Sequence, residues 1–462
     1  MKTLRASKRI TITDCAATTC CTDAGLGREL VLSSAPGNQL PVWVVIGLAA
    51  MLALWPLSVS RAESGSSCVD CHSEMGEKRL KDPVKGLTED IHYAKGLGCQ
   101  DCHGGDPKAG MAEGDPELAH NPAKGFVGAP LPKDIPEFCA RCHSDVEFMK
   151  KFNPKLRVDQ LAEYKSSQHG KLLETGDMKV ATCVSCHGVH GILPVTDSRS
   201  PVHRSNVPAT CAKCHSKAEY MRPYGIPTDQ FDLYKSSVHG VKLLEKGDLA
   251  APACNNCHGN HGATPPGLTS IAFACGECHA NNRDFFNQSP HKDAYAQMNL
   301  GECTTCHNHH DIARPTDAML GVGDSALCKR CHSRGDAGYE VAAKMSRHLD
   351  SLKSTLSHAH DLLTRAERGG VNVRLGKYDL HAADDALIKA RTAVHYFSLE
   401  KFDEIAGAGI GEAQNIITQG EEALWDLRVR QIGLGISVPI ILWVALALYL
   451  RIRRMERDRP IV

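Results

Sequence analysis

The chain has 462 residues, which is enough for more than one domain, and its formal net charge is zero. It contains 21 cysteines and 24 histidines but only 5% aromatic residues, so an ordinary side-chain core along the whole length is not expected. The balanced charge gives no reason to expect a nucleic-acid partner.

The first 62 residues are interpreted as an N-terminal extension and a signal peptide. An apolar run from Leu40 to Leu57 is followed by Ser60-Arg61-Ala62, which places small residues at the −3 and −1 positions of a cleavage after Ala62. A retained N-terminal anchor is the alternative. The extension also carries three cysteines that belong to no repeated motif: Cys15, Cys20 and Cys21.

Eighteen of the 21 cysteines lie in nine copies of Cys-x-x-Cys-His within residues 63–335. This motif is the attachment signal for c-type haem: two thiols bind the vinyl groups, and the histidine binds the iron as proximal ligand. Zinc sites gather Cys and His ligands in fours, and neither zinc nor disulfides explain a histidine after the second cysteine in every copy. We therefore expect nine covalent haem c groups. The attachment residues would be Cys68, Cys71, Cys99, Cys102, Cys139, Cys142, Cys183, Cys186, Cys211, Cys214, Cys254, Cys257, Cys275, Cys278, Cys303, Cys306, Cys328 and Cys331. The proximal ligands would be His72, His103, His143, His187, His215, His258, His279, His307 and His332.

The motif copies alternate between two types. Four are followed by Gly or Asn, as in CVSCHG at Cys183, and five are followed by Ser or Ala, as in CARCHS at Cys139. The repeating unit, called a module here, is therefore a pair of motifs used four times, with one additional motif at the front. The modules begin at Cys99, Cys183, Cys254 and Cys303.

Histidines outside the motifs recur in step with the modules. YKSSQHG at Tyr164 returns as YKSSVHG at Tyr234, and CHGVHG at Cys186 returns as CHGNHG at Cys257. We expect such histidines to be distal ligands of six-coordinate irons. The ninth iron could use His203, His309 or a histidine of the C-terminal region. The distal candidates are His92, His120, His169, His190, His239, His261, His291 and His310.

A helical pattern without cysteine follows Arg334. Apolar residues recur every three or four positions from Val341 to Ala366, and Gly369-Gly370 should end this helix. A second helix is expected over 379–397 and a third from Leu399, so residues 336–430 should form a helical bundle. One bundle histidine is a candidate ligand across the domain boundary; the alternative is that all are ordinary surface or core residues. These histidines are His348, His358, His360, His381 and His395.

Residues 432–450 should be a transmembrane helix. They are uncharged, and 19 residues at about 1.5 Å each can cross a hydrocarbon core of about 30 Å. Pro439 is tolerated in such a helix. Five arginines follow in residues 451–462, so the positive-inside rule places this tail in the cytoplasm. The motif-bearing region would then lie in the periplasm, in agreement with haem attachment outside the cytoplasm.

The alternating motifs, the Ser-x-His-Gly before them, the CHGxHG phrase and the helical C-terminal region resemble the multihaem cytochromes c over roughly residues 64–430. This superfamily includes membrane-anchored quinol-linked cytochromes and, more distantly, pentahaem nitrite reductases and octahaem hydroxylamine oxidoreductases. The resemblance implies a mainly α fold with much irregular loop, organised around haems stacked in close pairs.

The expected function is electron transfer without catalytic residues, because two imidazole ligands leave no open position on an iron and keep its potential low. The resemblance implies a carrier in the inner membrane. Its partners would be a quinone-linked subunit (a cytochrome b or quinol-oxidising subunit), periplasmic or outer-membrane cytochromes and the cytochrome c maturation machinery.

The alternative is an oxidoreductase that acts on a small nitrogen or sulfur compound at one open haem. Nitrite-reducing relatives usually carry Cys-x-x-Cys-Lys at the active haem, whereas all nine motifs here end in histidine. Hydroxylamine oxidoreductases keep the histidine but cross-link a tyrosine, and none of the ten tyrosines is marked as that residue. If one haem were open, the sites of His72 and His332 would be the candidates.

Overall fold

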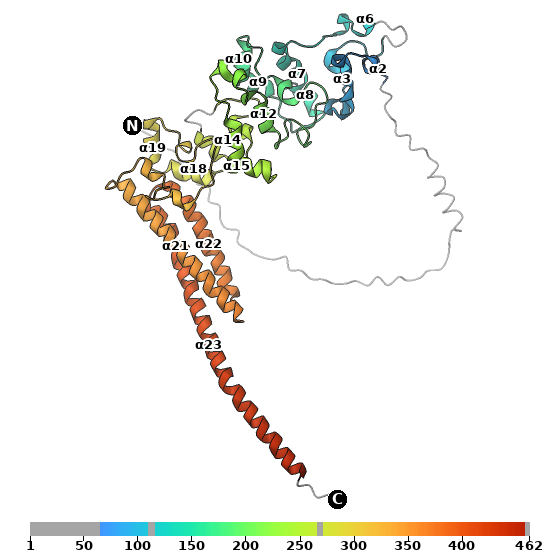
Figure 1. Cartoon of the computed structure of the whole chain (residues 1–462). Helices are drawn as coiled ribbons and strands as arrows, with labels where there is room; N and C mark the ends of the chain where they lie inside the picture. Colours follow the sequence, from blue (N-terminus) through green and yellow to red (C-terminus); the bar gives the residue numbers. More distant parts are fainter. Residues whose placement is uncertain (1–64, 110–115, 266–270, 458–462) are drawn as a thin grey trace, which may run out of the picture. The chain divides into compact units, whose positions relative to one another are not determined.

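The computed structural model describes residues 65–109, 116–265 and 271–457, and every regular element in these ranges is a helix (Figure 1). The expected mainly α fold with much irregular loop is therefore confirmed. The signal peptide and extension predicted for residues 1–62 lie outside the described residues, as does the end of the arginine-rich tail. The motif-bearing region and the C-terminal helices belong to one compact unit that begins at Gly65.

Each motif lies in a short helix or at its end. A cysteine at position i, a cysteine at i+3 and a histidine at i+4 share one face of a helix, so a single turn presents all three groups on the same side. The motif helices are α2 (Ser67–Glu74), α5 (Cys99–His103), α7 (Ile135–His143), α11 (Cys183–His187), α12 (Val207–His215), α16 (Cys254–His258), α17 (Ile271–Gly276), α20 (Thr304–His307) and the 3-10 helix η8 (Cys328–Arg330).

Short helices and irregular loops connect the motifs. A small buried apolar cluster in this region contains Tyr234, Leu243, Ala251 and Ala253. So few buried apolar side chains leave room for large prosthetic groups as the core. The connecting elements are α3 (Lys78–Lys85), η1 (Leu87–Glu89), α4 (Ile91–Ala94), α6 (Pro116–Ala119), η2 (Pro122–Lys124), η3 (Pro132–Asp134), α8 (Val146–Lys150), α9 (Gln160–Ser166), α10 (Gln168–Glu174), α13 (Ala218–Met221), η4 (Arg222–Tyr224), α14 (Gln230–Ser236), α15 (Val238–Gly240), the π-helix η5 (Val241–Glu245), α18 (Ala280–Asn287), α19 (His291–Met298) and η7 (Asp317–Met319).

Three long helices pack side by side at the C-terminal end (Figure 1). They are α21 (Ala337–Arg368), α22 (Arg374–Ala393) and α23 (Leu399–Arg457), and the 3-10 helix η9 (Val394–Tyr396) joins the second to the third. The expected helical stretch from Val341 to Ala366 is present, and it ends at Gly369 as predicted. The second helix begins at Arg374, five residues earlier than expected, because its first turn packs Gly376 against Leu363 of α21.

Small residues let α23 approach its neighbours closely. Gly409 faces Ala386 and Leu352, and Gly420 faces Leu362. Phe402 of the same helix is fully buried, and burial of such a side chain contributes about 1.5–3 kcal/mol. The bundle therefore has an ordinary side-chain core, unlike the motif-bearing region.

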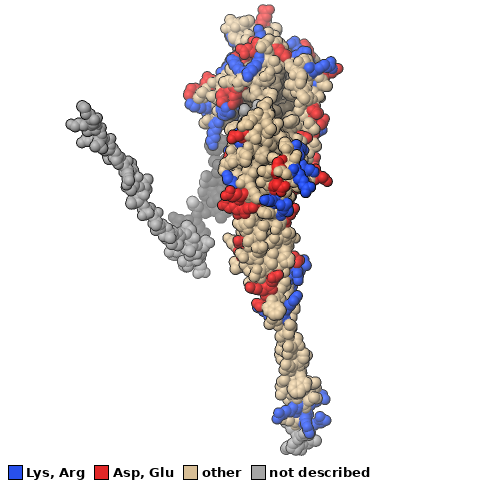
Figure 2. Space-filling model, turned by 90° about the vertical axis from the view of Figure 1, so that its left-hand side faces the viewer, with Lys and Arg blue, Asp and Glu red and all other residues tan. Residues whose placement is uncertain are grey.

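The predicted transmembrane segment, residues 432–450, is part of α23 rather than a separate element. Nothing in the sequence between Leu399 and Arg457 stops the helix, and Pro439 is accommodated within it. Its apolar window has a mean hydropathy of 2.2 and is not buried against other residues, so it is a candidate membrane anchor by length and composition. Figure 2 shows this stretch without charged residues, with a group of Lys and Arg at its end.

Candidate functional site

The two motif types end their helices in different ways. In the first type the residue after the histidine has a positive φ: 69° at Gly104, 88° at Gly188, 86° at Gly259 and 60° at Asn308. Only Gly, and less readily Asn, adopts this conformation without strain, which explains why these two residues follow the histidine. In the second type Ser144 and Ser216 keep a negative φ. The two motif types that alternate in the sequence therefore differ in the backbone conformation of the residue after the motif histidine.

A side chain within the motif also fixes the start of the first-type helices. In three of the four first-type motifs the residue before the second cysteine accepts a hydrogen bond from the backbone N–H that precedes the motif. Asp101 accepts from Gly98 at 2.7 Å, Ser185 from Thr182 at 3.0 Å and Asn256 from Ala253 at 2.9 Å. This contact satisfies one N–H that the short helix leaves free.

Every motif histidine faces one histidine from outside the motifs. The two rings of a pair are too far apart for direct contact, and their separations fall within a narrow range. The ring-centre distances are 6.1 Å for His72 and His120, 6.2 Å for His103 and His190, 5.9 Å for His143 and His92, 6.2 Å for His187 and His261, 6.1 Å for His215 and His169, 5.9 Å for His258 and His310, 6.3 Å for His279 and His239, 6.2 Å for His307 and His395, and 6.0 Å for His332 and His291.

These separations fit a haem iron between the two rings. Two metal–imidazole bonds of about 2 Å, together with the distance from each nitrogen to its ring centre, add up to about 6 Å. The donor set also fits, since paired imidazoles are axial ligands of haem, whereas closed metal sites need more ligands. In the described part of the chain, no cluster of three or more His, Cys, Asp or Glu residues could hold a metal ion.

The pairing follows two relations along the chain. A histidine before a module faces that module's second motif, as His169 faces His215. A histidine after a module's first motif faces the first motif of the preceding module, as His190 faces His103. The modules therefore interlock. The first relation also holds for His92 with His143, His239 with His279 and His291 with His332, and the second for His261 with His187 and His310 with His258.

Hydrogen bonds within the repeated YKSSxHG stretch hold the backbone around the upstream histidine in place. The Ser237 hydroxyl donates to the Tyr234 carbonyl at 2.7 Å and accepts from the Gly240 N–H at 3.0 Å. The Tyr234 hydroxyl donates to the Pro252 carbonyl at 2.8 Å, just before the motif at Cys254. A Cβ at Gly240 would lie 1.9 Å from the Tyr234 carbonyl oxygen, so only glycine fits there. The same contacts recur at Tyr164, Ser167 and Gly170.

Several rings are oriented by a hydrogen bond at Nδ1, which leaves Nε2 free to bind a metal. Nδ1 lies 3.0 Å from the Leu80 carbonyl in His72 and 2.9 Å from the Thr392 carbonyl in His395. In His92 the partner is the buried Asp90 carboxylate, also at 3.0 Å.

Burial keeps most of these rings neutral, which is the form that binds metal. Burial lowers the pKa of each of these histidines below its usual value: His143, His169, His187, His190, His215, His239, His261, His291, His307, His310 and His395.

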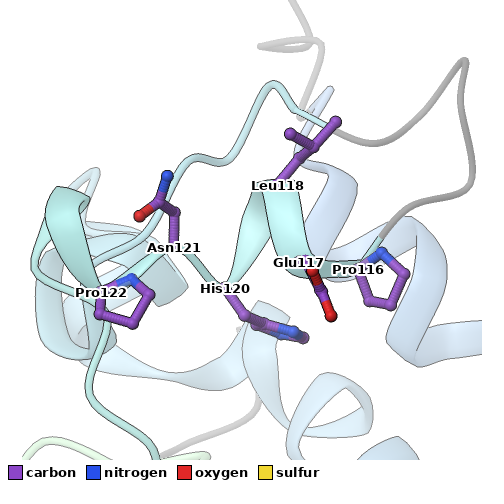
Figure 3. Close-up of a pocket in the computed structure, with 6 residues that line it drawn as sticks. All are labelled: Pro116, Glu117, Leu118, His120, Asn121 and Pro122. Atoms are coloured by element: carbon purple, nitrogen blue, oxygen red, sulfur yellow. The ribbon is translucent and has the colours of Figure 1, made fainter.

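The front motif shares the arrangement of the modules. His120 follows α6, and Figure 3 shows its ring on the same side as Glu117, with Leu118 on the other side. These residues line a cavity of about 550 Å³. The Phe126 ring packs against His120 at 4.6 Å between ring centres, while His120 faces His72.

Neighbouring motifs are also close to each other at their cysteines. The Cys68 side chain lies beside the Cys99 side chain of the next motif. The Cys186 side chain is likewise close to the Cys211 side chain of the next motif. The nine motifs thus follow one another in space in their chain order. The same proximity of side chains in successive motifs relates Cys139 to Cys183, Cys211 to Cys254, Cys275 to Cys303, Cys102 to Cys142, Cys257 to Cys275 and Cys306 to Cys328.

The structure brings all eight distal candidates of the sequence opposite a motif histidine, and it adds His395 of the bundle. The other histidines considered have different partners: His203 contacts Ser205, His309 contacts His310, His348 contacts Asp403 and His360 contacts Asp384, while His358 and His381 are exposed. One signal in the sequence indicates that a bundle histidine is needed, since the last module has no following module to supply a histidine to its first motif.

The fold and the repeated motifs define a multihaem c-type cytochrome with covalently bound haem c. Residues 91–226 and 246–334 match the cytochrome c3 family, and residues 56–104 match the family of cytochrome c554 and c-prime.

Curated relatives agree with this class. The C-type polyheme cytochrome OmcB of Geobacter sulfurreducens is 26% identical over 217 residues, which is 42% of this chain and 25% of OmcB. The C-type polyheme cytochrome OmcC of the same organism is 23% identical over 308 residues, 64% of this chain and 32% of OmcC. The matches thus span about a quarter to a third of these relatives' length. No solved structure matches the chain.

Proposed function

We propose that the protein carries nine haems in a row, each iron held between two histidines, and that it transfers electrons along this row. The observation that carries the proposal is the one-to-one facing of motif and non-motif histidines at 5.9–6.3 Å. Two axial imidazoles fill the iron coordination in both oxidation states, so electrons can enter and leave with little rearrangement.

The order of the motifs in space supports a continuous path. Each motif contacts the next through a cysteine, and cysteines attach the edges of the porphyrins. The proximity of Cys275 and Cys303, for example, would bring the edges of two haems together. Electrons would therefore pass from haem to haem in chain order between the front motif and the bundle.

The candidate anchor supports a place in the inner membrane with the haems in the periplasm. Arg451, Arg453, Arg454 and Arg457 directly follow the apolar part of α23, which favours a cytoplasmic tail. The bundle would then lie between the last motif and the membrane, and the row would exchange electrons with a quinone-linked membrane partner, such as a cytochrome b or quinol-oxidising subunit. The front motif would face periplasmic or outer-membrane cytochromes, and haem attachment would need the cytochrome c maturation machinery.

Mass spectrometry and electron paramagnetic resonance test the proposal. The mature protein should carry nine covalent haems, and the oxidised form should be low-spin at every iron. Seven or fewer haems would contradict the row as described. A high-spin ferric signal that disappears on addition of nitrite or hydroxylamine would favour the oxidoreductase alternative.

The orientation has its own test. A protease added to spheroplasts should digest the haem-bearing part, and a reporter fused after Val462 should be active only in the cytoplasm. A periplasmic reporter would reverse the proposed orientation.

The sites at His72 and His332, expected from sequence to be the candidates for an open haem, both face a second histidine. This geometry favours the carrier over the oxidoreductase.

A further inference from the structure

A short segment between the second and third bundle helices contacts the last two sites of the row, those of His307 and His332. It consists of η9 (Val394–Tyr396) and Phe397, which adopts a left-handed conformation with φ of 48°. The left-handed conformation is strained for a phenylalanine, and it persists only where the surrounding structure holds the residue in place. The segment thus has a fixed shape that its neighbours impose.

His395 is the residue of this segment that faces a motif. Its ring centre lies 6.2 Å from that of His307, and the two rings are nearly parallel, with an angle of 26° between them. Its Nδ1 is 2.9 Å from the Thr392 carbonyl, so Nε2 is the nitrogen left for a metal. The Asn282 side-chain nitrogen lies 3.2 Å from Nδ1 and 3.4 Å from Nε2, so α18 lies beside the ring.

The neighbouring residues dock the segment on the last site as well. Phe397 packs on His291 at 4.1 Å between ring centres, and His291 faces the last motif histidine, His332. Tyr396 stacks on Phe285 of α18 at 4.1 Å. Two sites of the row therefore share contacts with one segment of the bundle.

The interlocking of the modules leaves one position for His395. The first motif of each module faces a histidine from the following module, but the module at Cys303 is the last. His395 lies where the histidine of a fifth module would lie.

We propose that His395 is the sixth ligand of the haem attached at Cys303 and Cys306, so that the bundle completes the eighth site and fixes the ninth. This inference rests on the proposed bis-histidine row. The bundle would then influence the redox properties of the row, because the eighth iron would be six-coordinate only when the bundle is folded against it.

Replacement of the ring tests the assignment in the full-length protein. In His395→Ala the oxidised protein should gain one high-spin ferric haem, and its ferrous form should bind one equivalent of carbon monoxide. Added imidazole should restore the low-spin spectrum, because it occupies the vacated position. His395→Met should instead raise the potential of one haem. The matched control is His381→Ala, an exposed histidine of α22, which should leave spectrum and potentials unchanged.

Two comparisons separate the possible outcomes. The haem content by mass spectrometry should be unchanged in all variants, which separates loss of a ligand from failed maturation. His169→Ala should open an iron by the same criteria, at the site of His215, where both facing histidines lie outside the bundle. If His169→Ala opens an iron and His395→Ala with full haem content does not, the inference on His395 is wrong. If neither variant opens one, the bis-histidine row itself is wrong.

Discussion

The imidazole rings of His103 and His190 face each other at 6.2 Å although the two residues belong to different modules. His190 lies only three residues after His187, yet it faces the motif of the preceding module. Sequence proximity therefore does not tell which ring serves which site, and neighbouring modules depend on each other for their ligands.

The first prediction uses this exchange. His190→Ala should open the iron attached at Cys99 and Cys102, while the iron beside His187 keeps His261 and stays low-spin. A density map of the variant with carbon monoxide bound would show this ligand on the iron held by His103, in the position vacated by His190. Binding at His187 instead would contradict the interlocked assignment.

The second prediction concerns the carboxylate at His92. Asp90 is buried and accepts from the His92 N–H and the Ile192 N–H at 2.8 Å each, and it also contacts His92 Nδ1. A carboxylate at Nδ1 makes the ring a stronger donor and stabilises the ferric iron. Asp90→Asn should therefore raise the potential of one haem by on the order of 60 mV, which is a tenfold shift for a one-electron couple.

Potentiometric titration followed in the visible spectrum measures this change. Asp82→Asn removes an exposed carboxylate of α3 and is the control, with no shift expected. An unchanged titration in Asp90→Asn with intact low-spin haems would show that the carboxylate does not tune the iron.

The third prediction concerns the glycine after the repeated histidine. Gly240→Ala would place a Cβ 1.9 Å from the Tyr234 carbonyl oxygen, a backbone atom that cannot rotate away. Overpacking of this kind costs about 1–3 kcal/mol, and it should also displace His239. Thermal unfolding and the amount of high-spin haem report the two effects. Gly128→Ala, which meets nothing within 4 Å, should change neither.

The fourth prediction is a pH dependence of the contact between the motif-bearing region and the bundle. The Asp317 carboxylate accepts from Arg391 at 2.8 and 2.9 Å and from Lys353 at 2.9 Å. The Arg391 guanidinium, with a smaller contribution from Lys353, lowers the pKa of Asp317 to about 2. Because the folded state has the lower pKa, the stabilisation is present above about pH 4 and is lost as the pH falls toward 2.

Asp317→Asn should therefore lower the free energy of unfolding by about 1–2 kcal/mol at neutral pH. The difference from the parent protein should shrink between pH 4 and pH 2. Unfolding followed by circular dichroism at several pH values measures it, with Asp385→Asn, an exposed residue of α22, as control. A difference that stays constant down to pH 2 would assign the effect to packing instead of charge.

Much of the architecture could be predicted from the sequence because covalent chemistry fixes it. The Cys-x-x-Cys-His spacing needs one helical turn, and the apolar period from Val341 to Ala366 needs a long amphipathic helix. Four distal candidates, His169, His190, His239 and His261, stood out because their phrases recur, and the other four stood out by their positions beside the modules. Their partners did not, since a ligand and its motif are brought together by packing between modules. His395 lacks any repeated phrase around it, so only its place opposite His307 distinguishes it from the other bundle histidines.

The interlocked modules resemble the units of a repeat protein, in which each unit is completed by its neighbour. If every facing pair holds an iron, removal of one motif would leave the histidine that faces it without a partner, whereas removal of a whole module would let His261 or its counterpart take the place of His190. Such a row can therefore change its length during evolution only in steps of two haems. Its ends need specialised pieces, which here are the front motif with His120 and the bundle segment with His395.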